Sequence, residues 1–382
     1  MFRHSIPIGR IFGISIDLDY SWFLIIGLLA WILAVSYFPA QLPNWSTAGY
    51  WLMGGVTAVM LFVSVLIHEL GHSVVAKGYG LSVPRITLFI FGGVSEIAAE
   101  PPSAVAEFWI AIVGPVTSFA LAAFFWEIEP FVAFSPALLA LAKYLALLNL
   151  VLGAFNLIPG FPLDGGRVLR AVVWRITGKY QQATSTAAAT GRFFGFFLIF
   201  LGVWQAFGGN LINGLWIIFI GWFLESAAGS QLKVAVLKNL LGGHKVVDAM
   251  KRDFPKVSGE ATLQELVDKH VLTRGERNFV VNGSDSHSGM VTLDAIQAVP
   301  RAAWPTTSAF QAMVPLQKLA ATNSEAMLWP VLEQMGRDGV NQLPVVDGNR
   351  IVGILSRDDI LHYLRVQQMF SDKSHNPPSD HM

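Results

Sequence analysis

Two histidines and a glutamate stand together in the segment VLIHELGHSV, residues 65–74. His68 and His72 are four residues apart, so on a helix both imidazoles project from one face, about one turn apart. That spacing suits two ligands of a single zinc ion, with Glu69 beside them as a general base for the attack of water. The five-residue pattern also recurs by chance, and its alternative interpretation is a buried polar cluster that holds helices together.

The pair of histidines leaves one position of a zinc site to be filled, because catalytic zinc usually has three protein ligands. The sequence contains no cysteine, and only three of its nine histidines lie in residues 1–224, namely His4, His68 and His72. The third ligand should therefore be an acid, and Asp164 in NLIPGFPLDGGR is the best candidate. The prolines and glycines before it break a straight helix and let the chain turn back. The alternative for Asp164 is an N-cap on the helix that follows.

Charged residues are distributed unevenly along the 382 residues, of which 53% are hydrophobic and 14% charged. Soluble domains usually carry about 25% charged residues. Of the 26 basic and 26 acidic residues, 19 lie in residues 1–224 and 33 lie in residues 225–382. The net charge is zero, which gives no indication of nucleic acid binding. The sequence predicts a membrane domain at 1–226, a linker at 227–244, a soluble domain at 245–368 and a disordered tail at 369–382.

Six apolar segments come close to the roughly 20 residues that a helix needs to cross a bilayer. They lie near 19–38, 50–76, 105–126, 136–158, 193–207 and 211–226. The segment 83–97 is too short to span and is rich in β-branched and aromatic residues, so it predicts a strand or hairpin buried in protein. IFGISIDLD predicts a short strand before the first span. The expected fold is a multi-pass α-helical membrane protein with a small hairpin or sheet, followed by an α/β domain.

Lysines and arginines fall on alternate sides of these spans. They occur before the first span and after the second, fourth and sixth, whereas the loops after the first, third and fifth spans contain none. Because such residues accumulate on the cytoplasmic side, we expect both termini and the C-terminal domain in the cytoplasm. The HELGH segment then lies near the cytoplasmic end of span two, in the plasma membrane of a bacterial cell.

Three motifs in order resemble the site-2 protease family of intramembrane zinc metalloproteases. HELGH lies in an apolar helix, a Gly-Gly hairpin follows it, and NLIPGFPLDGGR comes later. The resemblance covers roughly residues 8–225, and the added C-terminal part is similar to the branch that contains the sporulation pro-sigma-factor protease. It implies that His68, His72 and Asp164 bind Zn²⁺ and that Glu69 activates water.

The same resemblance assigns roles to residues beyond the ligands. Asn156 lies eight residues before Asp164, and the broken chain between them can let both side chains face one cavity. By resemblance, Asn156 orients the substrate or stabilises the oxyanion. The hairpin that contains Gly92 and Gly93 is expected to hold the substrate as an extended strand.

A weak duplication marks the C-terminal part of the chain. Residues 277–296 align with residues 341–360 at an offset of 64, and each copy predicts a strand, a turn, a strand and a helix. The copies resemble the cystathionine-β-synthase (CBS) repeat, which pairs into a module and often binds adenosine nucleotides.

The two copies differ at the position that holds the ribose in that family, an acid three residues after a Thr or Ser. Ser356 is followed by Asp359, whereas Thr292 is followed by Ala295. At most one site for a nucleotide such as ATP or AMP is therefore expected, at Ser356 and Asp359. The alternative is a purely structural pair that docks or dimerises, and the sequence favours neither interpretation. Dimerisation through the pair would make the chain a homo-oligomer.

The first functional hypothesis is a zinc endopeptidase of the lipid bilayer. It would cleave a membrane-anchored regulatory protein within or near its transmembrane segment, with nucleotide binding to the CBS pair as a modulator. The alternative is a CBS-gated membrane transporter or channel, which would spread polar groups over several spans, whereas here they concentrate in two segments. An inactive, substrate-binding relative is a third hypothesis, against which the intact Glu69 argues.

Overall fold

The computed structural model describes residues 5–97, 99–276, 278–282, 289–348 and 350–373. Contacts divide the chain into two compact units, Met1–Ala235 and Val236–Met382. Within the described residues six helical segments are long and apolar enough to cross a membrane, which confirms the expected multi-pass helical fold. They are Tyr20–Gln41, which contains α1 (Tyr20–Ile32) and α2 (Phe38–Gln41), then α3 (Thr47–Gly78), α4 (Ala104–Glu127), α6 (Pro136–Asn156), α8 (Tyr180–Phe207) and α9 (Leu211–Leu241).

The last two of these helices are longer than their apolar segments predicted. The expected segment 193–207 is the end of α8, and the expected segment 211–226 is the beginning of α9. Hydropathy detects only the apolar part of a helix, whereas backbone hydrogen bonding continues through residues of good helix propensity whatever their polarity. Residues 227–241 of the predicted linker are accordingly helical and belong to α9.

Serine N-caps start three of the long helices. The side chains of Ser46, Ser103 and Ser135 accept a hydrogen bond from a backbone N–H in the first turn of α3, α4 and α6, respectively. Each cap satisfies one of the four backbone donors that a helix leaves open at its beginning. Each cap thus stabilises the first turn of its helix at the point where the preceding loop ends.

A four-stranded sheet accompanies the helices of the first unit. Its order is β1 (Ser5–Ile11), β2 (Ile14–Asp19), β3 (Arg85–Phe89), β4 (Gly92–Ser95), with β2 and β3 parallel and the other pairs antiparallel. The stretch IFGISIDLD, expected as one strand, contains the turn between β1 and β2. The alternating side chains Ile14, Ile16 and Leu18 pack into a core with Ala76 and Ile110. The sheet is thereby attached to the ends of α3 and α4.

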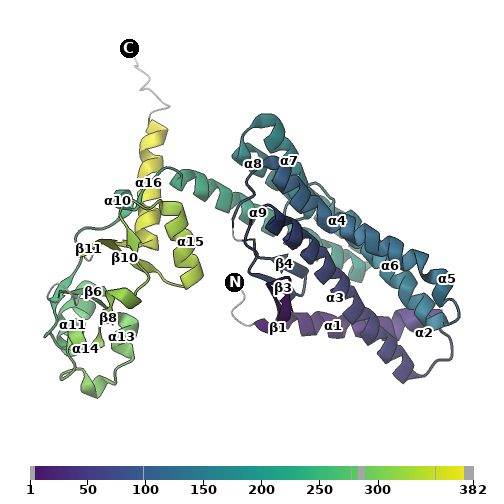
Figure 1. Cartoon of the computed structure of the whole chain (residues 1–382), viewed down its shortest axis with the longest axis horizontal. Helices are drawn as coiled ribbons and strands as arrows, with labels where there is room; N and C mark the ends of the chain where they lie inside the picture. Colours follow the sequence, from purple (N-terminus) through teal and green to yellow (C-terminus); the bar gives the residue numbers. More distant parts are fainter. Residues whose placement is uncertain (1–4, 98, 277, 283–288, 349, 374–382) are drawn as a thin grey trace, which may run out of the picture. The chain divides into compact units, whose positions relative to one another are not determined.

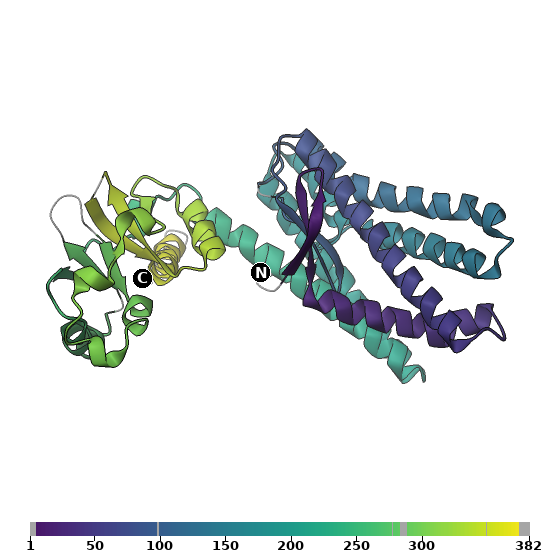
Figure 2. The same ribbon diagram turned by 60° about the horizontal axis from the view of Figure 1, so that its bottom comes forward.

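The helix α4 packs against α3, α6 and the shorter α7 (Asp164–Thr177). The strands lie at one end of α3 and α4, whereas α2 and α5 (Glu129–Val132) lie at the other end (Figure 1). Figure 2 shows the same arrangement from a second direction. Segments far apart in the sequence, namely the end of α3, the β3–β4 hairpin and the start of α7, are thus gathered at one end of the bundle.

The second unit contains two small sheets that repeat one strand pattern. β6 (Asn278–Asn282) pairs with β7 (Gly289–Thr292), and β10 (Gln342–Asp347) pairs with β11 (Arg350–Ser356), both antiparallel. The register repeats at the offset of 64, because Asn278 lies opposite Thr292 and Gln342 lies opposite Ser356. A parallel strand lies beside the first strand of each pair, β5 (Lys256–Ser258) beside β6 and β9 (Thr322–Asn323) beside β10. The first sheet has a fourth strand, β8 (Val314–Pro315), antiparallel to β7.

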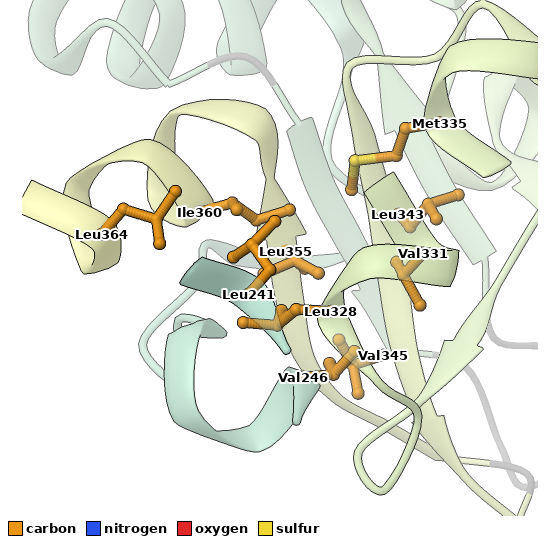
Figure 3. Close-up of a cluster of buried hydrophobic side chains, with 10 residues drawn as sticks. All are labelled: Leu241, Val246, Leu328, Val331, Met335, Leu343, Val345, Leu355, Ile360 and Leu364. Atoms are coloured by element: carbon orange, nitrogen blue, oxygen red, sulfur yellow. The ribbon is translucent and has the colours of Figure 1, made fainter. Parts of the chain in front are cut away.

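Each repeat has its own hydrophobic core. The second core contains the last residue of α9, Leu241, together with side chains from β10, β11, α15 (Leu328–Asp338) and α16 (Arg357–Lys373) (Figure 3). Leu241, Val345 and Leu355 are fully buried there. The end of the sixth long helix is therefore part of the fold of the second unit.

Candidate metal centre

Three side chains converge at the end of the bundle where the sheet lies. His68 and His72 project from α3, and their Nε2 atoms are 3.1 Å apart. The Oδ2 atom of Asp164, at the start of α7, lies 3.1 Å from Nε2 of His68 and 3.2 Å from Nε2 of His72. Both histidines are 3% exposed, so the site is closed to bulk water on the side of the helices. The helical spacing brings the two imidazoles together, and the chain break before α7 adds the carboxylate.

These distances fit a single zinc ion. Ligand atoms about 2.0–2.1 Å from a tetrahedral ion lie about 3.3 Å from one another, close to the separations found here. Two imidazole nitrogens and one carboxylate oxygen are also a donor set used by catalytic zinc sites. The cluster thus offers three ligands and leaves the fourth position for a reacting group.

The second nitrogen of each imidazole is held by α4. The Nδ1 atom of His72 donates to the carbonyl oxygen of Ile110 at 2.6 Å, and Nδ1 of His68 lies 2.8 Å from Oγ of the buried Ser118. A proton on Nδ1 leaves the lone pair of Nε2 free for a metal, and such bonds orient metal-binding imidazoles. Sequence reasoning missed Ser118, because a lone serine in an apolar helix carries no recognisable signal.

Gly114 of α4 lies directly against the two Nε2 atoms. A Cβ atom at this position would be 2.1 Å from Nε2 of His72 and 2.7 Å from Nε2 of His68. No real side chain makes such a contact, so only glycine lets α4 approach the histidines this closely. This requirement also escaped sequence reasoning, since an isolated glycine before Pro115 reads as an ordinary break in a membrane helix.

Replacing Gly114 by alanine should therefore displace at least one imidazole. We expect zinc affinity to fall by about 100-fold or more, the upper end of the loss caused by disturbing groups that support metal ligands. Metal analysis of the purified full-length protein measures it. Gly55→Ala is the matched control, because Gly55 is in α3 and a Cβ there meets nothing within 4 Å. Equal zinc content in both variants would contradict the close contact described above.

Asp164 is the first residue of α7, and its carboxylate faces the histidines. The N-cap position belongs to Leu163, which makes no side-chain cap bond, so the predicted alternative of an Asp164 N-cap does not describe this helix. A Cβ at Gly165 would lie 2.4 Å from the carbonyl oxygen of Ile158. The Gly-Gly pair after Asp164 thus allows the returning chain to pack on its own preceding loop.

A buried ion pair fastens α7 to α4. Arg170 donates from Nε to Oε1 of Glu107 at 2.6 Å, and the Glu107 side chain is fully buried. The guanidinium also lies over the rings of Phe161 and Tyr180, at 4.9 Å and 5.0 Å from their centroids. Because breaking one partner of such a pair leaves an uncompensated buried charge, the contact holds α7, and with it Asp164, in place.

Glu69 lies beside the cluster and faces the hairpin. Its Oε2 atom accepts a hydrogen bond of 2.6 Å from the hydroxyl of Ser95 on β4. A Cβ at Gly93 would be 2.5 Å from Cγ of Glu69, so this glycine allows the strand to touch the glutamate. Gly92 has a φ of +127°, a backbone conformation that favours glycine, and a Cβ there would meet nothing within 4 Å. The two glycines of the hairpin therefore serve different purposes.

Asn156 is the last residue of α6 and is half-buried. Among the described residues its amide forms no hydrogen bond with the three clustered side chains. A role toward the substrate thus stays a prediction for this residue.

The second unit contains a pocket between its two repeats. The pocket has a volume of about 140 Å³ and its lining includes Lys251, Asn278, Gln342, Ser356 and Asp359. Ser356 and Asp359 bond each other's side chain and backbone at the start of α16, and Nζ of Lys251 lies 2.7 Å from Oδ1 of Asp359. The predicted ribose-binding acid thus lines a pocket and also caps a helix.

Comparisons with known proteins identify relatives of this chain. The chain matches the family described as Peptidase family M50 over residues 56–136 and 132–201, and the CBS domain over residues 314–366. Rip3 of Mycobacterium tuberculosis, whose name presents it as a candidate zinc metalloprotease, is 36% identical over 374 residues, which cover 96% of this chain and 94% of Rip3. The zinc metalloprotease MJ0392 of Methanocaldococcus jannaschii is 28% identical over 96% of this chain and 98% of its own length.

Among solved structures, the site-2 protease from Methanocaldococcus jannaschii is similar to this chain. It has 31% sequence identity and a TM-score of 0.43, and the match covers 60% of this chain and 95% of that one.

Proposed function

Because this chain belongs to peptidase family M50, the site-2 type of intramembrane zinc metalloproteases, we propose that it cleaves a membrane-anchored regulatory protein within or near its transmembrane segment. His68, His72 and Asp164 would bind the zinc ion, and Glu69 would be the general base. The observation that carries the proposal is the convergence of three ligand atoms from α3 and α7 at separations of 3.1–3.2 Å, with Glu69 one residue from His68.

The residues around the cluster have distinct tasks in this reaction. Zinc, when bound, polarises the scissile carbonyl group and lowers the pKa of water. Glu69 accepts the proton of the attacking water and passes it to the leaving amine. Ser118 and the Ile110 carbonyl keep the two imidazoles in orientation. Asn156 is proposed to orient the substrate or to stabilise the oxyanion.

The hairpin offers a place for an extended substrate. β4 is the last strand of the sheet, with β3 on one side, and within the described part of the chain no strand pairs with its other edge. A helical substrate segment hides its peptide bonds in its own hydrogen bonds and must unwind before attack. Strand addition at β4 would hold the unwound segment by main-chain bonds, next to Glu69. The contact of Gly93 with Glu69 supports this placement.

The orientation in the membrane is part of the proposal. His72 lies six residues before the end of α3, about 9 Å along the helix axis. The basic residues at and after this end, Lys77 in the last turn of α3 and Arg85 beyond it, favour the cytoplasmic side. Cleavage would then occur near the cytoplasmic face, on the side where the CBS pair is expected.

The decisive experiment co-expresses the full-length chain with candidate membrane-anchored regulators and compares wild type with Glu69→Gln. Processing by the wild type alone supports the proposal. Equal processing by both would overturn it.

The CBS pair is proposed to bind an adenine nucleotide in the pocket at Ser356 and Asp359, and thereby to modulate cleavage. A ribose would replace Lys251 as the partner of the Asp359 carboxylate. The Lys251 side chain is 70% exposed, so its ammonium group remains in contact with water when it leaves the carboxylate. The released ammonium group can then approach a phosphate group. Association of two chains through their CBS pairs is also proposed.

Calorimetric titration of the full-length protein with AMP, ADP and ATP tests the nucleotide site. We expect binding by the wild type and a loss of at least about tenfold in Asp359→Asn, which removes the charged acceptor but keeps the shape of the cap. Asp358→Asn is the control, because this neighbouring carboxylate is exposed and does not line the pocket. The absence of heat with all three nucleotides would leave the pair with a structural role.

A further inference from the structure

We propose that Ser95 is a positioning residue that holds the carboxylate of Glu69 in the orientation needed for proton transfer. The inference rests on the proposed role of Glu69 as general base. It adds to the hairpin a function that is separate from binding substrate, since the strand that would receive the substrate also carries the hydroxyl that orients the base.

The direction of the hydrogen bonds supports this role. A serine hydroxyl has one proton to donate. The hydroxyl of the buried Ser73 donates to Oγ of Ser95 at 3.2 Å. Oγ of Ser95 lies 2.6 Å from Oε2 of Glu69 and 3.3 Å from the Glu69 carbonyl oxygen, so its proton goes to the nearer carboxylate. The short distance is typical of a hydroxyl that donates to a carboxylate. Ser73 follows Glu69 by one helical turn, so both side chains lie on the face of α3 that meets Ser95 of β4.

The bond restricts a side chain that would otherwise rotate. Among the described residues, Ser95 provides the only hydrogen bond to the Glu69 carboxylate. Oε2 accepts the bond from Ser95, and Oε1 accepts none within the described part of the chain. Gly93 lies against the same side chain. A Cβ atom added at Gly93 would be 3.1 Å from Cδ and 3.3 Å from Oε1 of Glu69. Glu69 is therefore fixed by two contacts from β4.

The strand pattern explains why these two residues act together. Alternate residues of a strand face the same side, so Gly93 and Ser95 both point to α3, whereas Gly92 and Val94 point away. The pairing of Leu88 with Gly93 and of Ile86 with Ser95 sets their position along α3. The sequence Gly93-Val94-Ser95 thus places a residue without a side chain and a hydroxyl donor on the side of β4 that meets Glu69.

The test uses acetohydroxamate, a small zinc-binding compound whose hydroxyl proton is accepted by the general base. Its affinity for the zinc-loaded full-length protein is measured by calorimetry in detergent. Ser95→Ala should weaken binding by about tenfold, the effect of losing a hydrogen bond to a charged group. Zinc content and thermal stability should stay at the wild-type values. Ser95→Thr, which keeps the hydroxyl, should restore affinity to within about threefold.

Thr87→Val is the matched control in the same sheet. The Thr87 hydroxyl is buried on β3 and has no hydrogen-bond partner among the residues that the structure describes, so its removal should leave hydroxamate affinity and stability unchanged. With any anchored protein that the wild type processes, Ser95→Ala should lower kcat by about tenfold and change KM by less than about twofold. A loss of stability or a rise in KM alone would assign Ser95 a purely structural role and overturn the inference.

The Glu69→Gln variant separates this inference from the proposed function. If Glu69→Gln binds acetohydroxamate weakly and Ser95→Ala binds it like wild type, the role of Ser95 is wrong and that of Glu69 stands. If Glu69→Gln binds it like wild type, Glu69 is not the base and both proposals fail.

Discussion

Glu69→Gln should lower the rate of substrate cleavage by about 10²–10⁴-fold, the usual contribution of a general base. Glutamine has the shape of glutamate, and its amide oxygen can still accept the hydrogen bond from Ser95. It cannot take a proton from water, however. Because Glu69 is not one of the three clustered ligands, zinc content should remain at the wild-type level.

The measurement is the rate at which the purified protein, reconstituted in vesicles, cleaves an anchored substrate identified by co-expression. Glu96→Gln is the control for removing one acid near the hairpin. The Glu96 side chain is 44% exposed and pairs with Arg85 on the surface, so its removal should change the rate by less than about twofold. A normal rate for Glu69→Gln with full zinc occupancy would show that another group takes the proton.

Asp164→Asn should remove zinc from the protein and cleavage with it. The substitution replaces an anionic oxygen that lies 3.1–3.2 Å from both imidazoles by a neutral amide. Zinc favours charged or strongly basic ligands, so we expect affinity to fall by at least about 100-fold, more than the loss usually caused by removing a supporting group. The fold should persist, because Asp164 is not the N-cap of α7.

Metal analysis after dialysis measures the zinc content, and circular dichroism checks the helices. Asp17→Asn is the matched control, since Asp17 is a buried aspartate of the same unit that bonds Ser15 and Arg85 instead of the histidines. Its zinc content should equal that of the wild type. If Asp164→Asn retained zinc yet lost activity, the carboxylate would have a role in the reaction other than that of a ligand.

Local patterns in the sequence were enough for much of the architecture. Hydropathy located six spans because a lipid-facing helix must be apolar over its length. The i, i+4 spacing placed His68 and His72 on one face, and the shortage of other ligands singled out Asp164. The duplication at an offset of 64 predicted two similar repeats in the C-terminal part, and the strand registers of β6–β7 and β10–β11 repeat at that offset. Each of these features depends on residues that are close in sequence or on composition.

Contacts between distant segments could not be read in this way. Ser95 bonds Glu69 across 26 residues, and Ser118 bonds His68 across 50. The need for glycine at position 114 arises only because α4 passes against both imidazoles. Serine and glycine are common in membrane helices and turns, so their types alone indicate no partner. The sequence therefore determined which side chains could do the chemistry, whereas the packing of α4 and β4 on α3 decided how those side chains are oriented. Their orientation depends on contacts between segments far apart in the chain, and such contacts produce no periodic pattern in the sequence.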